Sequence, residues 1–149
     1  MIGAATTEGV DESAFPPAFV QGLDAIRKRL VPEAVVEVVE DNFAWIRLGD
    51  TTLDTGLFTV PKARLWARAP LTFPNAVPYG IATAPILARA DGGAIDRQHV
   101  NHQMVQALGR VVGVTDLAFY SWDWNNMSTR EATDLVAIVE WARRRLREG

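Results

Sequence analysis

The sequence predicts an α+β domain with an antiparallel sheet, because a helix, a run of short strand-like segments and a second helix follow one another along the chain. Apolar residues recur at helical spacing near both ends. The segments between them are rich in β-branched and aromatic residues and are separated by turn residues. With 149 residues, of which 48% are hydrophobic and 22% charged, the chain fits one domain that buries its own core.

The first helix follows a short polar leader. Residues 1–13 are small, polar and acidic and show no periodicity, so we expect a flexible leader before a single domain over residues 15–149. Pro17 suits the first turn of a helix, and Pro32 follows shortly after its end. The apolar residues on one face of this helix are Phe19, Leu23, Ile26 and Leu30.

The next segments predict about four strands in a meander. Residues 34–40 and 43–48 are joined by Asp41 and Asn42, which tolerate the positive φ of a two-residue hairpin turn. A short third segment covers residues 57–60. Residues 63–69 alternate small or aliphatic with large or charged side chains, which indicates a strand with one solvated face. Residues 81–87 predict another strand that breaks near Pro85.

The second half of the chain predicts an irregular region and a closing helix. Residues 90–93 read as a turn, residues 100–108 as a helix, and residues 117–121 as extended or irregular chain. Ser128 and Glu131 then form a capping box. The apolar stripe of the helix that follows is Leu135, Ile138, Val139, Ala142 and Leu146.

Composition excludes several classes of function. A net charge of −3 disfavours nucleic acid as the main partner, and we interpret the arginines at 143–147 as cations that offset the negative end of a helix dipole. The chain has no cysteine, which removes thiolate nucleophiles, thioester intermediates and Cys-ligated zinc. No apolar run near 18 residues and no signal-peptide pattern occurs, so we expect a cytoplasmic protein that does not contact membranes.

A proline-rich stretch between the predicted strands at 63–69 and 81–87 carries a resemblance. Residues 70–78 read P-x-x-F-P-x-x-x-P, formed by Pro70, Phe73, Pro74 and Pro78. Each proline fixes φ and favours an extended predecessor, so the chain crosses the sheet edge along one rigid path. The stretch resembles the F-P-x-x-Y-P-x-x-x-P signature of the ubiquitin-conjugating (UBC) fold, where it lies between the third and fourth strands.

The order of elements over residues 15–147 is also similar to the UBC fold. Trp122 and Trp124, before the Ser128 cap, resemble the tryptophan segment that precedes the helix after the active site of conjugating enzymes. The divergent prokaryotic UBC-like families carry a Leu-Gly-Arg element upstream of tryptophans, and here Leu108, Gly109 and Arg110 match it.

Departures from that pattern decide which function the resemblance implies. No His-Pro-Asn tripeptide occurs, and the position equivalent to the catalytic cysteine falls within Ala94, Ile95, Asp96 and Arg97. Nothing there can carry a modifier as a thioester. One helix follows the tryptophan segment, where active conjugating enzymes usually have two. These features resemble catalytically inactive conjugating-enzyme variants, and we therefore expect residues 94–97 to be a vestigial active-site loop.

The resemblance implies a non-catalytic binding module of a bacterial ubiquitin-like modification pathway, plausibly in antiphage defence. Its partners would be a ubiquitin-like protein, a ThiF-like activating enzyme or a modifier-removing metalloprotease.

An alternative is an active conjugating enzyme whose cysteine, near Ala94 to Arg97, has been replaced in this chain. Another is a different enzyme that uses Asp96, His99 and His102, which would share one face if this segment were helical. We expect no metal, because structural zinc normally uses four ligands and no H-E-x-x-H pattern occurs, and no cofactor, because no nucleotide or dinucleotide motif is present. A third reading is a generic α+β adaptor.

Tryptophan and arginine side chains supply the candidate binding surface. Trp66 shares an alternating strand face with Arg64 and Arg68, and an exposed tryptophan between two arginines would suit protein binding. A helix or loop that covers this face is the alternative. Trp122 and Trp124 alternate in an extended segment, so we expect one to pack inside the domain and the other to face solvent.

Overall fold

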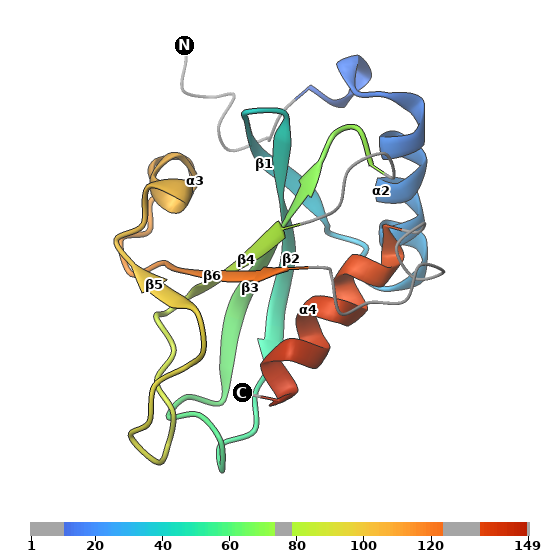
Figure 1. Ribbon diagram of the computed structural model, residues 1–149. Coiled ribbons are helices and arrows are strands. Elements are labelled where there is room, and N and C mark those ends of the chain that lie inside the picture. The colour runs from blue at the N-terminus through green and yellow to red at the C-terminus, as the bar shows by residue number, and fades with distance from the viewer. Residues whose placement is uncertain (1–10, 74–78, 124–134, 149) are drawn as a thin grey trace.

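The computed structural model describes residues 11–73, 79–123 and 135–148 (Figure 1). It is an α+β structure in which six strands form one antiparallel sheet. In chain order, the elements are the 3-10 helix η1 (Glu12–Ala14), α2 (Pro17–Arg29), β1 (Val35–Glu40), β2 (Phe43–Thr52), β3 (Lys62–Pro70), β4 (Tyr79–Ala84), β5 (Gln98–Val100), the 3-10 helix η2 (Gln103–Val105), α3 (Gln106–Val112), β6 (Ala118–Asp123) and α4 (Val136–Glu148).

The sheet has the order β1-β2-β3-β4-β6-β5. The first four strands form the expected meander, but two further strands extend it beyond the predicted number of about four. β6 pairs with β4, and the three-residue strand β5 pairs with β6 at the edge. A strand of three residues is too short to show a period of two in the sequence, so β5 was not predicted.

The β1–β2 hairpin is confirmed. Asp41 and Asn42 connect the two strands with φ values of 55° and 66°, as a type I′ turn requires. Phe43 pairs with Glu40 immediately after the turn. Two short polar residues that tolerate positive φ therefore determine where the chain reverses.

Helices cover both faces of the sheet. α2 and α4 lie on one face and α3 lies on the other (Figure 1). The larger buried cluster lies between the sheet and α2 and α4; the smaller one lies under α3 and contains Trp45, Trp66 and Phe119. The indole Nε1 of Trp45 donates a hydrogen bond to the Met104 carbonyl at 3.3 Å, which ties β2 to η2.

The covering by α3 overturns the expectation that β3 has one solvated face. Residues 65–70 are buried on both sides of the strand, and Trp66 is 0% exposed. The alternation reflects one apolar face and a second face, carrying Trp66 and Arg68, that is buried over residues 65–70. A strand in the middle of a sheet that helices cover on both sides keeps little solvated surface.

One further predicted element is wrong, and another holds only in part. Residues 57–60 form no strand; Phe58 makes an isolated bridge with Arg89. The helix expected over residues 100–108 is confirmed only from Gln103 onward, where η2 and α3 follow one another. Val100 belongs to β5 and is 51% exposed, because pairing with β6 holds residues 98–100 extended, which local propensity does not reveal.

The helices at the two ends follow the prediction where they are described. Phe19, Leu23 and Ile26 of α2 are fully buried, whereas Leu30 lies past the helix end and is 38% exposed. The expected capping box at Ser128 and Glu131 lies outside the described residues. Within those that are described, no helix combines the length and the apolar character needed to cross a bilayer.

The end of the expected leader contacts the domain. Residues 12–14 form η1, and the Arg27 guanidinium of α2 contacts the Glu12 carboxylate at 2.6 Å (Nη2 to Oε2) and 3.0 Å (Nη1 to Oε1). Arg27 Nε also donates to the Ala34 carbonyl at 2.8 Å. One guanidinium thus joins η1, α2 and the chain just before β1.

Candidate functional site

The loop at residues 94–97 lies where the chain returns from β4 to the edge strand β5. Ala94, Asp96 and Arg97 are exposed, while Ile95 is buried in the core. The Trp122 indole Nε1 donates to the Asp96 carbonyl at 2.8 Å, and the Ser121 amide donates to the Arg97 carbonyl at 3.1 Å. The loop backbone is therefore fixed to β6, while three of its four side chains face solvent.

Helix α4 also holds this loop. The Arg145 guanidinium lies 4.7 Å from the centre of the Trp122 ring, within the range of a cation–π contact, and 3.8 Å from the Asp96 carboxylate. Trp122 itself is 2% exposed, as expected for one of the two tryptophans of this segment. Trp124 lies outside the described residues.

A buried network of polar side chains connects β4, β5 and β6 at the same edge of the sheet. The Tyr120 hydroxyl lies 2.8 Å from the Thr83 hydroxyl and accepts from Gln98 Nε2 at 3.2 Å. Gln98 Nε2 also donates to the Leu87 carbonyl at 2.8 Å. Burial raises the pKa of the Tyr120 hydroxyl, so this group stays protonated at neutral pH.

The two histidines lie on either side of the turn after β5. His99 is on β5, with Nε2 2.9 Å from the Ser121 hydroxyl; His102 caps η2 by accepting the Met104 amide at Nδ1, 3.1 Å away. Their rings are 5.1 Å apart, and both pack on Phe119, at 5.9 Å and 4.8 Å. Burial lowers the pKa of the His102 imidazole, and the neighbouring His99 lowers it further.

This arrangement does not bring Asp96, His99 and His102 together on one helix face. His99 is on a strand, His102 precedes a 3-10 turn, and the Asp96 carboxylate is turned toward Arg145. Throughout residues 11–73, 79–123 and 135–148, no group of three His, Cys, Asp or Glu side chains is placed to hold a metal ion. The expected shared face required a helix that the β5–β6 pairing replaces.

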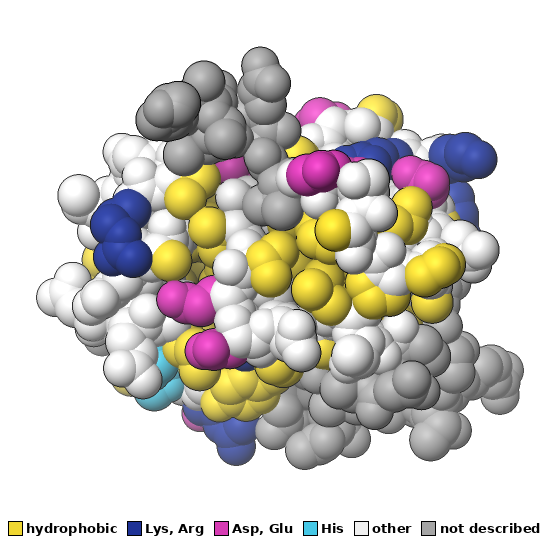
Figure 2. Space-filling view, turned by 90° about the horizontal axis from the view of Figure 1, so that it is seen from above, with side chains coloured by type: hydrophobic (Ala, Val, Ile, Leu, Met, Phe, Trp, Pro, Cys, Tyr) yellow, Lys and Arg dark blue, Asp and Glu magenta, His cyan; other side chains and the backbone are white. Residues whose placement is uncertain are grey.

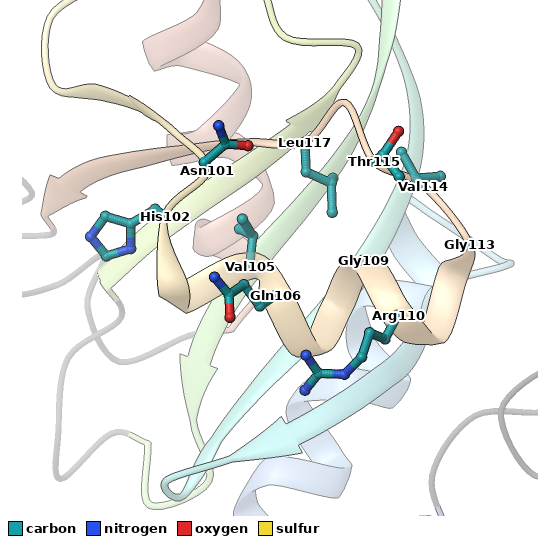
Figure 3. A pocket seen from close by; sticks show the side chains of 10 residues that line it. All are labelled: Asn101, His102, Val105, Gln106, Gly109, Arg110, Gly113, Val114, Thr115 and Leu117. Atoms are coloured by element: carbon teal, nitrogen blue, oxygen red, sulfur yellow. The ribbon is translucent and has the colours of Figure 1, made fainter.

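An open pocket of about 660 Å³ adjoins the histidines (Figure 3). It lies between α3 and the chain that leads from α3 into β6. Leu117 points toward the helix from that chain, while Arg110 extends along the outer side of α3. The lining residues are Asn101, His102, Val105, Gln106, Gly109, Arg110, Gly113, Val114, Thr115 and Leu117.

Two features of α3 shape this pocket. Gly109 allows the close approach of the following chain, because a Cβ there would lie 2.9 Å from the Val114 carbonyl oxygen. Gly113 ends the helix in the left-handed conformation at φ 71°, and its amide donates to the Gly109 carbonyl at 2.9 Å. Arg110 also lines a second pocket of about 340 Å³, shared with Glu40 and Met104.

The binding surface expected at Trp66 is not formed. Trp66 is fully buried beneath α3, and Arg68 is 7% exposed, with its guanidinium 3.9 Å from the centre of the Phe43 ring. Burial lowers the pKa of the Arg68 guanidinium. Of these three residues, only Arg64 is exposed; it lies near the start of β3, ahead of the buried residues 65–70.

The proline-rich stretch begins at the end of β3 and precedes β4 in the chain. Pro70 ends β3 and is buried, and Phe73 is 4% exposed within the larger core cluster. Pro74 and Pro78 lie outside the described residues. The part of the motif that the structure describes therefore packs against the core at the end of β3.

Sequence reasoning missed Phe119 and the pocket on α3. Phe119 contacts both histidines and lies 6.2 Å from the ring centres of Trp45 and Tyr79. No short pattern identifies such a residue, because its neighbours come from four separate segments. The Leu-Gly-Arg element was the available signal for the pocket, since Gly109 and Arg110 line it and Leu108 is fully buried beneath it.

The face of the molecule seen in Figure 2 carries both positive and negative side chains, as the small net charge of −3 predicts. Lys and Arg side chains lie apart from one another there, with Asp and Glu between them, and no continuous basic stripe is seen (Figure 2).

Comparisons of the chain with protein-family models, with curated proteins and with solved structures give no match.

Proposed function

We propose that the protein is a non-catalytic, UBC-like binding module of a bacterial ubiquitin-like modification pathway, with a role in antiphage defence. Its partner is a ubiquitin-like protein or the ThiF-like activating enzyme or metalloprotease that handles it. The observation that carries the proposal is the 94–97 loop. Its backbone is anchored by Trp122 and Ser121, yet it holds no group able to form a thioester.

The position of the proline-rich stretch supports the UBC-like part of the proposal. It lies between the third and fourth strands of a meander that follows an N-terminal helix. Phe73 packs in the core directly after β3. The expected order was a helix, a four-stranded sheet and a second helix. The two additional strands, β5 and β6, depart from that order.

We place the binding surface on α3 rather than on the β3 face. The pocket on α3 is open and mainly apolar, with Arg110 at its outer side, whereas Trp66 and Arg68 are buried. A partner segment that lies along α3 would cover the partly exposed His102 and Val114 and would meet the exposed Arg110 side chain. Protein interfaces are enriched in arginine, and their buried centres are mainly apolar.

The test is capture of tagged protein from cells that express the ubiquitin-like protein and the adenylyltransferase, with and without reductant, read by intact mass spectrometry. We expect a non-covalent complex that survives reductant, with no change in the mass of this chain. Purified partner is then titrated against two charge-reversal variants. Arg110→Glu is expected to weaken binding by about tenfold or more, while Arg64→Glu leaves it unchanged. Failure to recover either partner contradicts the proposal.

One observation favours a second candidate, a conjugating enzyme whose cysteine has been replaced. Ala94 is exposed in the loop at which the resemblance places that cysteine. The Ala94→Cys variant, incubated with modifier, adenylyltransferase and ATP, tests it. A mass increase of one modifier that reductant reverses would support this candidate, and an unmodified variant would favour the non-catalytic module.

A further inference from the structure

The arginines near the end of α4 do not act as one group. Arg145 is directed toward Trp122 and Asp96. Arg143 and Arg147, one helical turn apart, line a separate pocket of about 280 Å³ with Asp50, Thr51 and Thr52 of β2. The C-terminal end of α4 lies beside the end of β2 (Figure 1). The two guanidinium groups therefore face the strand end rather than serving the helix dipole alone.

One residue of the lining, Thr51, has a buried hydroxyl. Thr51 is 9% exposed, and its Oγ1 has no hydrogen-bond partner among the described residues. Burial of an unpartnered hydroxyl costs free energy, and valine would fill the same volume without that cost. A hydroxyl kept at this position is explained if a bound group completes its hydrogen bonding.

The charges of the pocket favour an anion. Within the described part of the chain, neither Arg143 nor Arg147 is within ion-pair distance of a carboxylate. Asp50 is the opposing charge in the lining, and its Oδ2 lies 3.6 Å from Lys62 Nζ, which offsets it. The lining thus carries two guanidinium groups against one carboxylate that already has a cation beside it.

From this geometry we propose that the pocket between β2 and α4 binds a phosphate group, held by the guanidinium groups of Arg143 and Arg147 and by the Thr51 hydroxyl. Arginine is suited to this role because its planar donors match the oxygens of a phosphate in pairs. The phosphate is either free or carried as a monoester on a small molecule. This site is separate from α3 and does not depend on the function proposed above.

The test is a titration of ¹⁵N-labelled full-length protein with inorganic phosphate, read by the chemical shifts of the backbone amides. Phosphate replaces chloride during the titration, so that the ionic strength stays constant. We expect saturable shifts confined to residues 50–52 and 143–147. Phosphoserine and acetate are titrated in parallel. Tighter binding of phosphoserine identifies a carried phosphate, and tighter binding of inorganic phosphate identifies the free ion. Acetate that binds as well as phosphate overturns the assignment to a phosphate group.

Three variants decide which side chains are responsible. Arg147→Gln is expected to weaken phosphate binding by about tenfold, whereas Arg144→Gln, with the same loss of charge on the same helix turn, changes it less than about twofold. Thr51→Val should also weaken phosphate binding. In chloride buffer without phosphate, its melting temperature should equal or exceed that of the wild type, because the Thr51 hydroxyl has no hydrogen-bond partner in the described part of the chain. Shifts that do not saturate, or equal losses in the two arginine variants, overturn the proposal.

Discussion

At the scale of single residues, burial separates side chains that look alike in the sequence. Arg64 and Arg68 flank Trp66 on β3, yet Arg64 is exposed while Arg68 lies buried against Phe43. His99 and His102 are both partly buried but differ in their hydrogen bonds: His99 pairs with a serine hydroxyl, and His102 caps a turn with Nδ1. The contact at Nδ1 requires an unprotonated nitrogen, which makes His102 sensitive to pH.

We expect His102 to make the protein less stable in acid. Its pKa is lowered in the folded state, below the ordinary value of 6.5, by burial and by the neighbouring His99, so the unfolded chain binds the proton more tightly. The stability contribution is present above pH 6.5 and is lost as the pH falls through the folded pKa. Urea unfolding between pH 7.5 and 5 measures this loss.

A matched variant separates His102 from other acid-sensitive groups. His102→Asn keeps an acceptor for the Met104 amide but cannot titrate in this range. The fall in the free energy of unfolding between pH 7.5 and 5 should be smaller in the variant than in the wild type. Identical pH profiles would show that His102 does not contribute.

At the scale of elements, α3 is formed by packing rather than by propensity. It has seven residues with glycine in the middle, and an isolated helix of this length and composition is not stable in water. Leu108 is fully buried in the cluster that contains Trp45 and Trp66. Close approach at Gly109 then brings the following chain against the helix and forms one wall of the pocket.

Gly109→Ala is expected to destabilise the protein although alanine favours helix formation. The gain in propensity is about 1 kcal/mol, but the added Cβ would lie 2.9 Å from the Val114 carbonyl oxygen. Displacing this backbone should cost about 1–3 kcal/mol, which outweighs the gain. Chemical denaturation measures the difference, and an equally stable or more stable variant would contradict the close approach.

The same experiment has a control one turn further on. Gly113 has open space around it, so Gly113→Asn meets no neighbour and tests the left-handed φ of 71° alone. Asparagine tolerates this conformation better than other residues with side chains. We expect a smaller loss of stability than for Gly109→Ala, together with an unchanged pocket.

At the scale of the whole molecule, a few arginines connect parts that are distant in the sequence. Arg145 connects α4 to the 94–97 loop through Asp96 and Trp122. Arg27 joins η1, α2 and the chain before β1 by its bonds to Glu12 and Ala34. The carboxylate of Glu12 raises the pKa of the Arg27 guanidinium, which stays charged at any pH of interest.

Arg27→Ala should therefore lower the free energy of unfolding by about 1–3 kcal/mol, because a partly buried charged donor is lost from two acceptors. Lys28→Ala, the next residue along α2, is exposed and should change it by less than about 0.5 kcal/mol. Urea denaturation compares the two. Equal effects would mean that Arg27 acts only as a surface charge.

The sequence by itself determined the elements with strong local signals. The first helix, the β1–β2 hairpin at Asp41 and Asn42, the strand at β3 and the lack of any thiol follow from spacing, turn chemistry and composition. Each of these depends on residues close together in the chain. The predicted binding role of the candidate residues stays a prediction, and its revised surface on α3 rests on the pocket found there.

Only the tertiary structure decided which surfaces are covered and which side chains meet. Trp66 is buried because α3 lies on its face of the sheet, and His99 and His102 meet on Phe119 because β5 pairs with β6. The pocket of Thr51, Arg143 and Arg147 joins residues about ninety positions apart. Local propensity contains no information on such contacts, since their free energy comes from burial between distant segments.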